Sequence, residues 1–307
     1  MAFVVSANTN NPYINLALEE KLCAFARDND APLLYLWQNS LCCVIGVNQN
    51  PWLECNTEEM EACGALLVRR KTGGGAVCHD LGNLNFSFCY PENGFDTKDG
   101  NSVILSALSS LGIEAEASGR NDLCISGKKF SGSAFRRAEG FSLHHGTLLV
   151  SSELSLFPKL LTPDSEKLKA KGVRSVSSRV TNLSDFCPGL TVNKIKTAVE
   201  TAFSEKFGEC AKLDPQSFDV AAEAQAYASP LFRYGRTPKF SENISFRLPS
   251  CGINAGLEVE KGVVRSCRIW TDSLDVTLPS RLEAAVIGKQ YSPELVKEEA
   301  EKLIKTI

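Results

Sequence analysis

Residues 69–88 read RRKTGGGAVCHDLGNLNFSF, which joins a glycine triplet to two arginines and a set of polar side chains. The apolar run at 65–68 predicts a buried strand before the glycines, and the apolar–polar alternation at 84–88 predicts a half-buried strand after them. Glycine lacks a Cβ, so the triplet lets the backbone turn sharply and lets a ligand approach it closely. One interpretation is a cradle for an anionic ligand; the other is a tight turn with bulges. The stretch is neither a P-loop nor a dinucleotide fingerprint, because no GK[ST] ends it and its glycine spacing differs.

The bulk composition allows a cored protein of one or two domains. The chain has 307 residues, of which 43% are hydrophobic, and a net charge of -3. That balance predicts no nucleic-acid partner. No run approaches the roughly 18 apolar residues of a membrane span, so we expect no membrane association. The N-terminal MAFVVSANTN lacks a basic targeting region, and we therefore expect a cytoplasmic protein.

Twelve cysteines are scattered along the chain without any C-x-x-C pair. Structural zinc sites need clustered thiolates, and disulfide scaffolds are much shorter chains. We expect the cysteines to be reduced and to serve ordinary packing.

Periodicity predicts both helices and strands, with a small α+β appendage at the end of the chain. Helices are expected at about 11–27, 57–62, 101–111, 191–207 and 293–304, and strands at 33–37, 42–47, 253–259 and 263–270. Residues 114–149 are rich in Gly and Ser and predict short strands and turns. The apolar pattern lapses at 230–243, where we expect a linker that divides the chain into domains at 1–240 and 241–307.

A second polar cluster, SGRNDLCISGKKFSGSAFRR, spans residues 118–137. Arg120, Asn121 and Asp122 precede a short strand, and Lys128 and Lys129 follow a glycine turn. A lysine held on a short turn can set a point charge against a phosphate or carboxylate oxygen. The alternative is that paired lysines at a hairpin tip are simply solvated.

Two further motifs are HHGTLL at 144–149 and KGVRSVSSRVTNL at 171–183. Adjacent strand residues face opposite sides, so only one of His144 and His145 should face a site, as a hydrogen-bonding group or as a core histidine. Residues 171–183 read as a basic loop that binds an anion or as solvated surface. Because no G-x-S-x-G elbow is present, hydrolase chemistry is not indicated.

In their order along the chain, these motifs resemble lipoate-protein ligase A over about residues 11–304. NLALEE, VIGVNQNPWLECN and VEKGVVRSCRIWTDSL support the likeness. The resemblance implies a catalytic domain of the class II aminoacyl-tRNA synthetase and biotin ligase type, in which helices surround a mixed sheet. It also implies a small α+β C-terminal accessory domain.

The resemblance further implies a two-step reaction. Lipoate, or octanoate, reacts with ATP to give an acyl-adenylate and pyrophosphate, and a lysine amine of a lipoyl domain then displaces AMP. Two anions must meet in the first step, so fixed positive charge and a divalent metal are needed. ATP would be a co-substrate with Mg²⁺, without a tightly bound prosthetic group. Acceptors would be 2-oxoacid dehydrogenase E2 subunits and glycine cleavage H protein, and the enzyme a monomer.

Residue by residue, the resemblance makes Lys129 the catalytic electrostatic stabiliser and Asp122 the metal contact. It implies ATP or adenylate contacts at Arg70, Gly75, Ala76, Val77, Cys78, Asn83, Asp122 and Lys129. It implies lipoate contacts at Arg70, Gly73, Gly74, Gly75, Lys129 and His145. The first helix and residues 44–46 would form an apolar tunnel, and the loop at 171–182 would close over the site.

Other functions stay open on the sequence alone. A transferase that uses acyl carrier protein forms an acyl-cysteine, but the segment VSSELSLFPKLLTPDSE lacks the Pro-Cys-Gly setting of that family, and Cys124 sits in a strand context that favours packing. A lipoyltransferase that takes preformed lipoyl-AMP would share the same motifs. Retention of Lys129, the triple glycine and HHG argues against an inactive binding protein.

Overall fold

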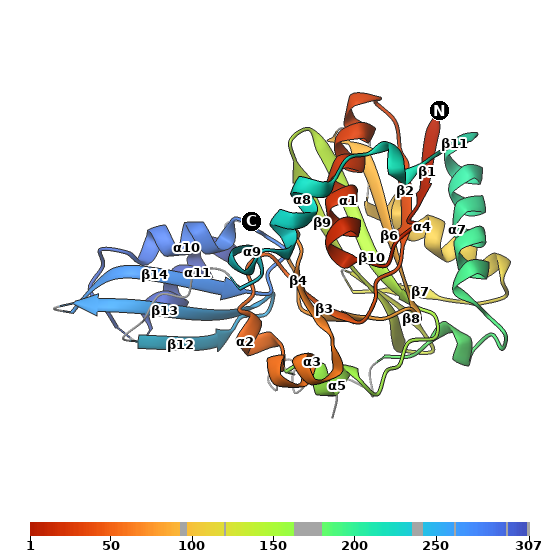
Figure 1. The fold of residues 1–307 in the computed structure, drawn as a ribbon. Coiled ribbons are helices and arrows are strands. Elements are labelled where there is room, and N and C mark those ends of the chain that lie inside the picture. Colours follow the sequence, from red (N-terminus) through yellow and green to blue (C-terminus); the bar gives the residue numbers. More distant parts are fainter. Residues whose placement is uncertain are drawn as a thin grey trace.

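The computed structural model describes residues 1–92, 97–119, 121–162, 180–234, 242–260, 262–292 and 294–305. Within these ranges the chain forms a larger unit around an eight-stranded mixed sheet and a smaller unit around a three-stranded sheet (Figure 1). The predicted fold class, mixed α/β with a small C-terminal domain, is confirmed.

The large sheet has the strand order β11-β1-β2-β6-β10-β9-β8-β7. Strand β1 pairs in parallel with β11 and β2, and every other pair is antiparallel. The strands are Ala2–Ser6 (β1), Leu33–Trp37 (β2), Asn83–Pro91 (β6), Glu116–Ser118 (β7), Asp122–Ile125 (β8), Lys128–Ala138 (β9), Phe141–Leu149 (β10) and Cys210–Leu213 (β11).

The expectation of only short strands over 114–149 is wrong for β9 and β10. These strands have 11 and 9 residues and form one long hairpin. The sequence predicts short strands and turns from the Gly and Ser content of this region, but Gly132 and Gly146 lie inside the strands, where a Cβ on Gly146 would come within 2.8 Å of the Gly132 carbonyl oxygen. Glycine here serves close strand contact and not chain reversal.

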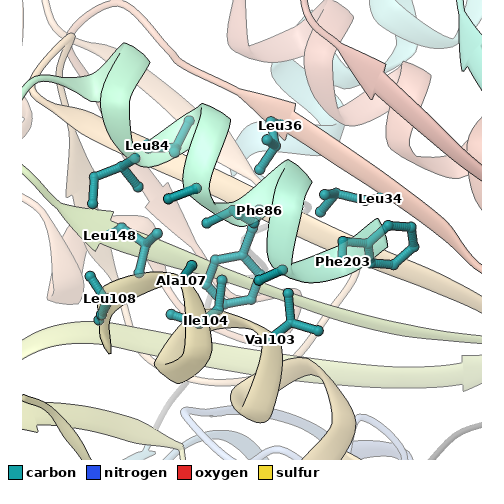
Figure 2. Packing of buried hydrophobic residues seen from close by; sticks show 14 of the residues in the cluster. Leu34, Leu36, Leu84, Phe86, Val103, Ile104, Ala107, Leu108, Leu148 and Phe203 are labelled. Atoms are coloured by element: carbon teal, nitrogen blue, oxygen red, sulfur yellow. The ribbon is translucent and has the colours of Figure 1, made fainter. Parts of the chain in front are cut away.

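Helices cover both faces of the large sheet (Figure 1). Helices α1 (Pro12–Asp28) and α8 (Ala221–Ala228) pack on one face, and α4 (Thr97–Ser110) and α7 (Val192–Phe207) on the other. Figure 2 shows the second face, where the leucines and phenylalanines of β2 and β6 meet α4 and α7. None of the helices in the described ranges combines the length and apolar character that crossing a membrane requires.

The predicted alternation in β6 is confirmed and decides which face carries the site. Leu84, Phe86 and Phe88 belong to the core under α4 and α7. Asn85 and Ser87 therefore point to the α1 face, since successive strand residues face opposite sides. Polar side chains thus collect on the α1 face of the sheet.

A small sheet of order β4-β3-β5 holds the glycine segment. Its strands are Cys42–Ile45 (β3), Leu66–Arg69 (β4) and Val77–His79 (β5), and helices Pro51–Glu54 (α2) and Thr57–Cys63 (α3) lie between β3 and β4. Residues 70–76 connect β4 to β5. The strand expected after the glycines, β6, thus belongs to another sheet, and the short β5 intervenes.

The smaller unit is an antiparallel sheet, Glu242–Arg247 (β12), Gly252–Glu260 (β13) and Val263–Thr271 (β14), with helices Leu278–Val286 (α10) and Leu295–Lys305 (α11) packed on it. The remaining elements are Phe157–Leu160 (α5), Leu183–Asp185 (η2), Pro215–Ser217 (η3) and Pro230–Tyr234 (α9).

Two expected boundaries differ. Helix α4 begins at Thr97 instead of 101, and the first part of the expected 230–243 linker is helix α9. The carbonyl oxygens of Phe232 and Arg233 at the end of α9 accept hydrogen bonds from the Arg69 guanidinium, which holds this segment against β4. Residues 235–241 of that linker lie outside the described residues.

Candidate functional site

A cavity of about 830 Å³ lies between the α1 face of the large sheet, the glycine segment and the C-terminal unit. Nine of the eleven predicted site residues line it: Arg70, Gly74, Gly75, Ala76, Val77, Cys78, Asp122, Lys129 and His145. A second, more open hollow of about 800 Å³ lies between α1 and residues 216–228, and its lining has no Lys, Arg or His. The first cavity is the candidate site, because the charged and polar motifs converge there.

The cavity runs across the strands of the sheet. Strand register places Trp37 beside Asn85, Asn85 beside Thr147, and Gly132 beside Asp122, and the Gly132 amide reaches the Thr147 hydroxyl at 3.3 Å. All five residues line the cavity. They span β2, β6, β10, β9 and β8, so four spacings of about 4.8 Å separate the ends by about 19 Å. The site is long, with Trp37 at one end and Asp122 at the other.

The Asp122 end carries the predicted lysine. Ser126 and Gly127 have positive φ angles of 50° and 74° and form the tight turn of the β8–β9 hairpin. Lys128 is exposed, while Lys129, 25% exposed, sets its Nζ 2.7 Å from the Asp122 Oδ1. A Cβ on Gly132 would lie 2.7 Å from the Lys129 Nζ, so this glycine gives the lysine room to lie across the strand. A fixed ammonium therefore faces this end of the cavity.

Arg70 holds the glycine segment in shape. Its guanidinium, 7% exposed, donates to the Thr72 Oγ1 and to the carbonyl oxygens of Val44, Gly73 and Gly75. Burial lowers the pKa of Arg70 to about 10, which leaves it a cation at neutral pH. The resemblance implied direct ligand contacts from Arg70; in the structure most of its N–H groups already bond to protein oxygens.

His145 links the glycine segment to α1. Its Nδ1 lies 2.8 Å from the Glu19 Oε1 and its Nε2 lies 2.8 Å from the Thr72 Oγ1. The Ser87 hydroxyl also donates to the Glu19 Oε1, at 2.5 Å. The other histidine of the pair, His144, packs among phenylalanine rings on the opposite face, where burial lowers its pKa to about 3. The prediction that only one of the two faces the site is confirmed.

The Trp37 end carries two polar side chains whose role the sequence did not indicate, His79 and Asn85. The Asn39 Oδ1 accepts from the Asn15 amide at 3.0 Å, so the Asn39 Nδ2 donates to the His79 Nδ1, also at 3.0 Å. The His79 proton therefore sits on Nε2. Burial, with the nearby Arg70 cation, lowers the pKa of His79 to about 3, so the ring is neutral. Among the described residues, neither the His79 Nε2 nor the Asn85 Nδ2 has a hydrogen-bond partner.

Two predicted residues do not line the cavity. A Cβ on Gly73 would lie 2.3 Å from the Ser273 carbonyl oxygen, so this glycine permits close contact with the C-terminal unit. Asn83 is fully buried, and its Nδ2 donates to the Asn85 Oδ1 at 3.0 Å. Both residues support the wall of the cavity from outside it.

The C-terminal unit forms part of the wall, which sequence reasoning missed. The Gly74 amide donates to the Ser273 carbonyl oxygen at 3.1 Å, and the Thr271 amide donates to the Asn48 carbonyl oxygen at 2.7 Å. Its lining residues are Arg247, Pro249, Ser250, Asp272, Ser273, Leu274, Asp275, Leu278 and Ile304. Sequence periodicity cannot predict which face of the C-terminal unit packs against the larger unit.

The structure also places the candidate cysteine nucleophiles and possible metal ligands relative to this cavity. Cys124 is buried and is not among the lining residues, whereas Cys78 lines the wall with its Sγ 3.4 Å from that of Cys43. The described residues contain no group of three or more His, Cys, Asp or Glu side chains arranged to hold a metal.

The basic loop with Lys171, Arg174 and Arg179, and also Arg120, lie outside the described residues. Of the 171–182 loop, only its end is described. The Thr181 amide there donates to the Lys129 carbonyl oxygen at 3.0 Å.

Two family profiles match the chain. The lipoyl protein ligase A/B catalytic domain matches residues 11–204, and the bacterial lipoate protein ligase C-terminus matches residues 237–306. Together they cover both structural units.

Solved structures of similar proteins span most of the chain. The P. falciparum protein LipL1, in complex with lipoate, is 30% identical with a TM-score of 0.83, covering 100% of this chain and 95% of that one. A bi-partite lipoate protein ligase from Thermoplasma acidophilum, solved with its E2 lipoyl domain, is 26% identical with a TM-score of 0.67, covering 78% and 99%. A lipoate-protein ligase A bound with ATP is 26% identical with a TM-score of 0.62, covering 75% and 94%.

Proposed function

The chain belongs to the lipoyl protein ligase A/B catalytic domain family, and we propose that it is an ATP-dependent lipoate–protein ligase. It would join lipoate to ATP, release pyrophosphate, and transfer the lipoyl group from lipoyl-AMP to a lysine of a lipoyl domain. The observation that supports this most is the long cavity with the Lys129–Asp122 pair at one end. Such a cavity suits a ligand with an anionic head and an extended tail. The similar proteins solved with lipoate and with ATP add support.

In the first step, Lys129 would offset repulsion between the lipoate carboxylate and the α-phosphate of ATP. Its ammonium is fixed by the β8–β9 hairpin and already faces a carboxylate, that of Asp122, at 2.7 Å. Preorganised charge of this kind stabilises the transition state without rearrangement during the reaction. The carboxylate oxygen attacks the α-phosphorus and pyrophosphate leaves.

In the second step, the acceptor amine would attack the acyl carbonyl and AMP would leave with the bonding electron pair. Negative charge develops on the carbonyl oxygen, and the same Lys129 ammonium stabilises it. No acyl group is attached to the enzyme in this scheme. The burial of Cys124 outside the cavity lining supports this scheme over an acyl-cysteine transferase.

The nucleotide would lie along residues 75–78, and Asp122 is the proposed Mg²⁺ contact. Mg²⁺ is usually held by one or two carboxylates together with substrate phosphates. The Asp122 carboxylate at the Lys129 end therefore fits an ion that arrives with the nucleotide. The ion would supply further neutralisation of phosphate charge.

The acceptors, by the same proposal, are lipoyl domains of 2-oxoacid dehydrogenase E2 subunits and glycine cleavage H protein. The structure solved with an E2 lipoyl domain supports the first class. We also propose that the enzyme acts as a monomer, with its domain boundary near residue 240.

The test is lipoate-dependent release of pyrophosphate from ATP, followed by mass analysis of an added lipoyl domain. Release of pyrophosphate and a lipoyl mass shift are both expected. Acceptor modification from synthetic lipoyl-AMP without pyrophosphate release from ATP would instead identify a lipoyltransferase. ATP-independent transfer from an acyl carrier protein would overturn the ligase assignment.

The role of Lys129 is tested by Lys129→Ala. Loss of one preorganised charge is expected to slow pyrophosphate release by about 100-fold or more. Lys128→Ala is the matched control, because Lys128 is exposed on the same turn, and it should retain normal turnover. Near-normal turnover of a folded Lys129→Ala protein would contradict the assignment.

A further inference from the structure

Arg247 brings a positive charge to the cavity from the C-terminal unit. In the part of the chain that the structure describes, three Lys and Arg residues line the cavity: Arg70, Lys129 and Arg247. Arg70 bonds to oxygens of the protein, and Lys129 lies on β9 of the large sheet. We propose that Arg247 is a further catalytic residue, which binds the pyrophosphate part of ATP while the acyl-adenylate forms. This inference rests on the proposed function and assigns a residue of the C-terminal unit to its first step.

The fold of the C-terminal unit holds Arg247 close to the glycine segment. Arg247 ends strand β12 and pairs with Gly252 on β13. The Gly252 amide donates to the Asp272 Oδ1 at 2.6 Å. The next residue, Ser273, has a carbonyl oxygen that accepts from the Gly74 amide at 3.1 Å. Arg247 therefore belongs to the wall that covers the glycine segment, beside which the nucleotide is proposed to lie.

The Arg247 guanidinium has a carboxylate neighbour whose place a phosphate oxygen can take. Its Nη2 lies 3.4 Å from the Asp272 Oδ2, and the Arg247 side chain is 18% exposed. Close charge-assisted hydrogen bonds are about 2.7–2.9 Å long, so this ion pair is loose. Arginine keeps its charge at physiological pH, and its planar fork binds two oxygens of a phosphate at once. The C-terminal unit thus presents a partly exposed cation that suits a phosphate group.

The first step of the proposed reaction needs positive charge at two separate points. A carboxylate oxygen of lipoate bonds to the α-phosphorus, the bond from this phosphorus to the bridging oxygen breaks, and its electron pair leaves with pyrophosphate. The attacking and leaving oxygens lie roughly in line on opposite sides of the phosphorus. One ammonium beside the attacking carboxylate, that of Lys129, therefore does not also neutralise the leaving group. Arg247 supplies the second charge from a different wall of the cavity.

This role limits Arg247 to reactions in which pyrophosphate is bound. In the second step pyrophosphate has left, and the acceptor amine attacks lipoyl-AMP, so that negative charge develops on the acyl carbonyl oxygen. Lys129 therefore serves both steps, whereas Arg247 serves only the first. A residue that only held the C-terminal unit in place would affect both steps alike.

The test gives the enzyme one compound, synthetic lipoyl-AMP, and two nucleophiles. Pyrophosphate attacks it to form ATP again, and the lysine of a lipoyl domain attacks it to give the lipoylated domain. Arg247→Gln keeps an amide that can bond to Asp272 but removes the charge. It should slow ATP formation about tenfold or more and leave lipoylation within about twofold of the wild-type rate. Lipoate-dependent pyrophosphate release from ATP should fall by a similar factor.

Arg265→Gln is the matched control. Arg265 lies on β14 of the same sheet, makes a similarly loose ion pair with Glu260 at 3.5 Å, and is not among the residues that line the cavity. Both reactions of lipoyl-AMP should keep their wild-type rates in this variant. Arg247→Lys keeps the charge without the planar fork and should slow ATP formation alone, by less than Arg247→Gln, so it tests the inference if Arg247→Gln does not fold.

Two kinds of failure are distinguishable. Equal loss of both reactions in a folded Arg247 variant, or no loss in either, would overturn the role of Arg247 and leave the ligase assignment intact. A wild-type protein that neither releases pyrophosphate from ATP nor consumes it with lipoyl-AMP would instead defeat the proposed function, and the inference with it.

Discussion

His79 and His144 are both buried, His79 on the α1 side of the large sheet and His144 on the opposite side. Both rings are neutral in the folded state. Their pKa values are lowered to about 3, because neither ring can hold a charge without solvent. In the unfolded chain the same rings titrate near 6.5. These residues show how burial in the fold changes the charge state of a side chain.

The free energy of unfolding should therefore fall as the pH is lowered from 6.5 to 5. In this window the unfolded chain binds protons at His79 and His144 and the folded chain does not, so acid favours unfolding. The expected slope approaches about 1.4 kcal/mol per pH unit for each histidine. Urea unfolding at several pH values measures it. His144→Gln should reduce the slope by about half, and a flat profile would contradict the burial of both rings.

At the scale of the element, hairpin β8–β9 and strand β6 show what sequence patterns can predict. Regular alternation in residues 84–88 predicted β6 and implied a polar face, which the structure places in the cavity through Asn85. Helix α1 was predicted from its apolar face and the proline near its first turn, and α3 from the capping pattern that begins at Thr57. The length of strands β9 and β10 is not predictable from the Gly and Ser content of residues 114–149, because Gly132 and Gly146 serve close strand packing there.

Gly132→Ala tests the link between hairpin geometry and chemistry. An added Cβ would meet only the Nζ and Cε of Lys129, at 2.7 and 2.9 Å, and the end of a flexible side chain can move aside. The melting temperature should hardly change, but Lys129 should be displaced and pyrophosphate release should fall about tenfold or more. Lys128→Ala, on the exposed turn of the same hairpin, is the control and should keep the wild-type rate. Normal turnover in Gly132→Ala would show that the lysine need not lie across this strand.

At the scale of the whole molecule, the site is assembled from parts that are distant in the sequence. The motifs at 70–78 and 122–129 were recognised because each is a contiguous run with its own chemistry. The place of Trp37 and Leu274 in the cavity lining could not be predicted from the sequence. It depends on strand register and on the docking of the C-terminal unit, and local sequence periodicity contains no information about either. The sequence thus predicts the individual motifs that line the cavity better than it predicts how they come together in space.

Gly73→Ala should loosen the contact between the two units. Its Cβ would lie 2.3 Å from the Ser273 carbonyl oxygen and 3.0 Å from the Leu274 Cα, and backbone atoms on both sides cannot easily yield. The Gly74 amide, which donates to the Ser273 carbonyl oxygen, should exchange its hydrogen faster. Hydrogen exchange read by mass spectrometry measures this, with the amides of β6 as internal reference. Unchanged protection of Gly74 would mean that the contact does not hold the units together.

Because the cavity runs across the strands of the large sheet, the spacing between strands determines the length that is available to a ligand. Each strand that the cavity crosses adds one interstrand spacing of about 4.8 Å. Backbone hydrogen bonds set this spacing, and side-chain substitutions leave those bonds in place. The length of about 19 Å between the β8 and β2 ends of the cavity therefore follows from the strand order of the sheet. Trp37 lines the cavity at its β2 end, so the bulk of this side chain bounds the length there.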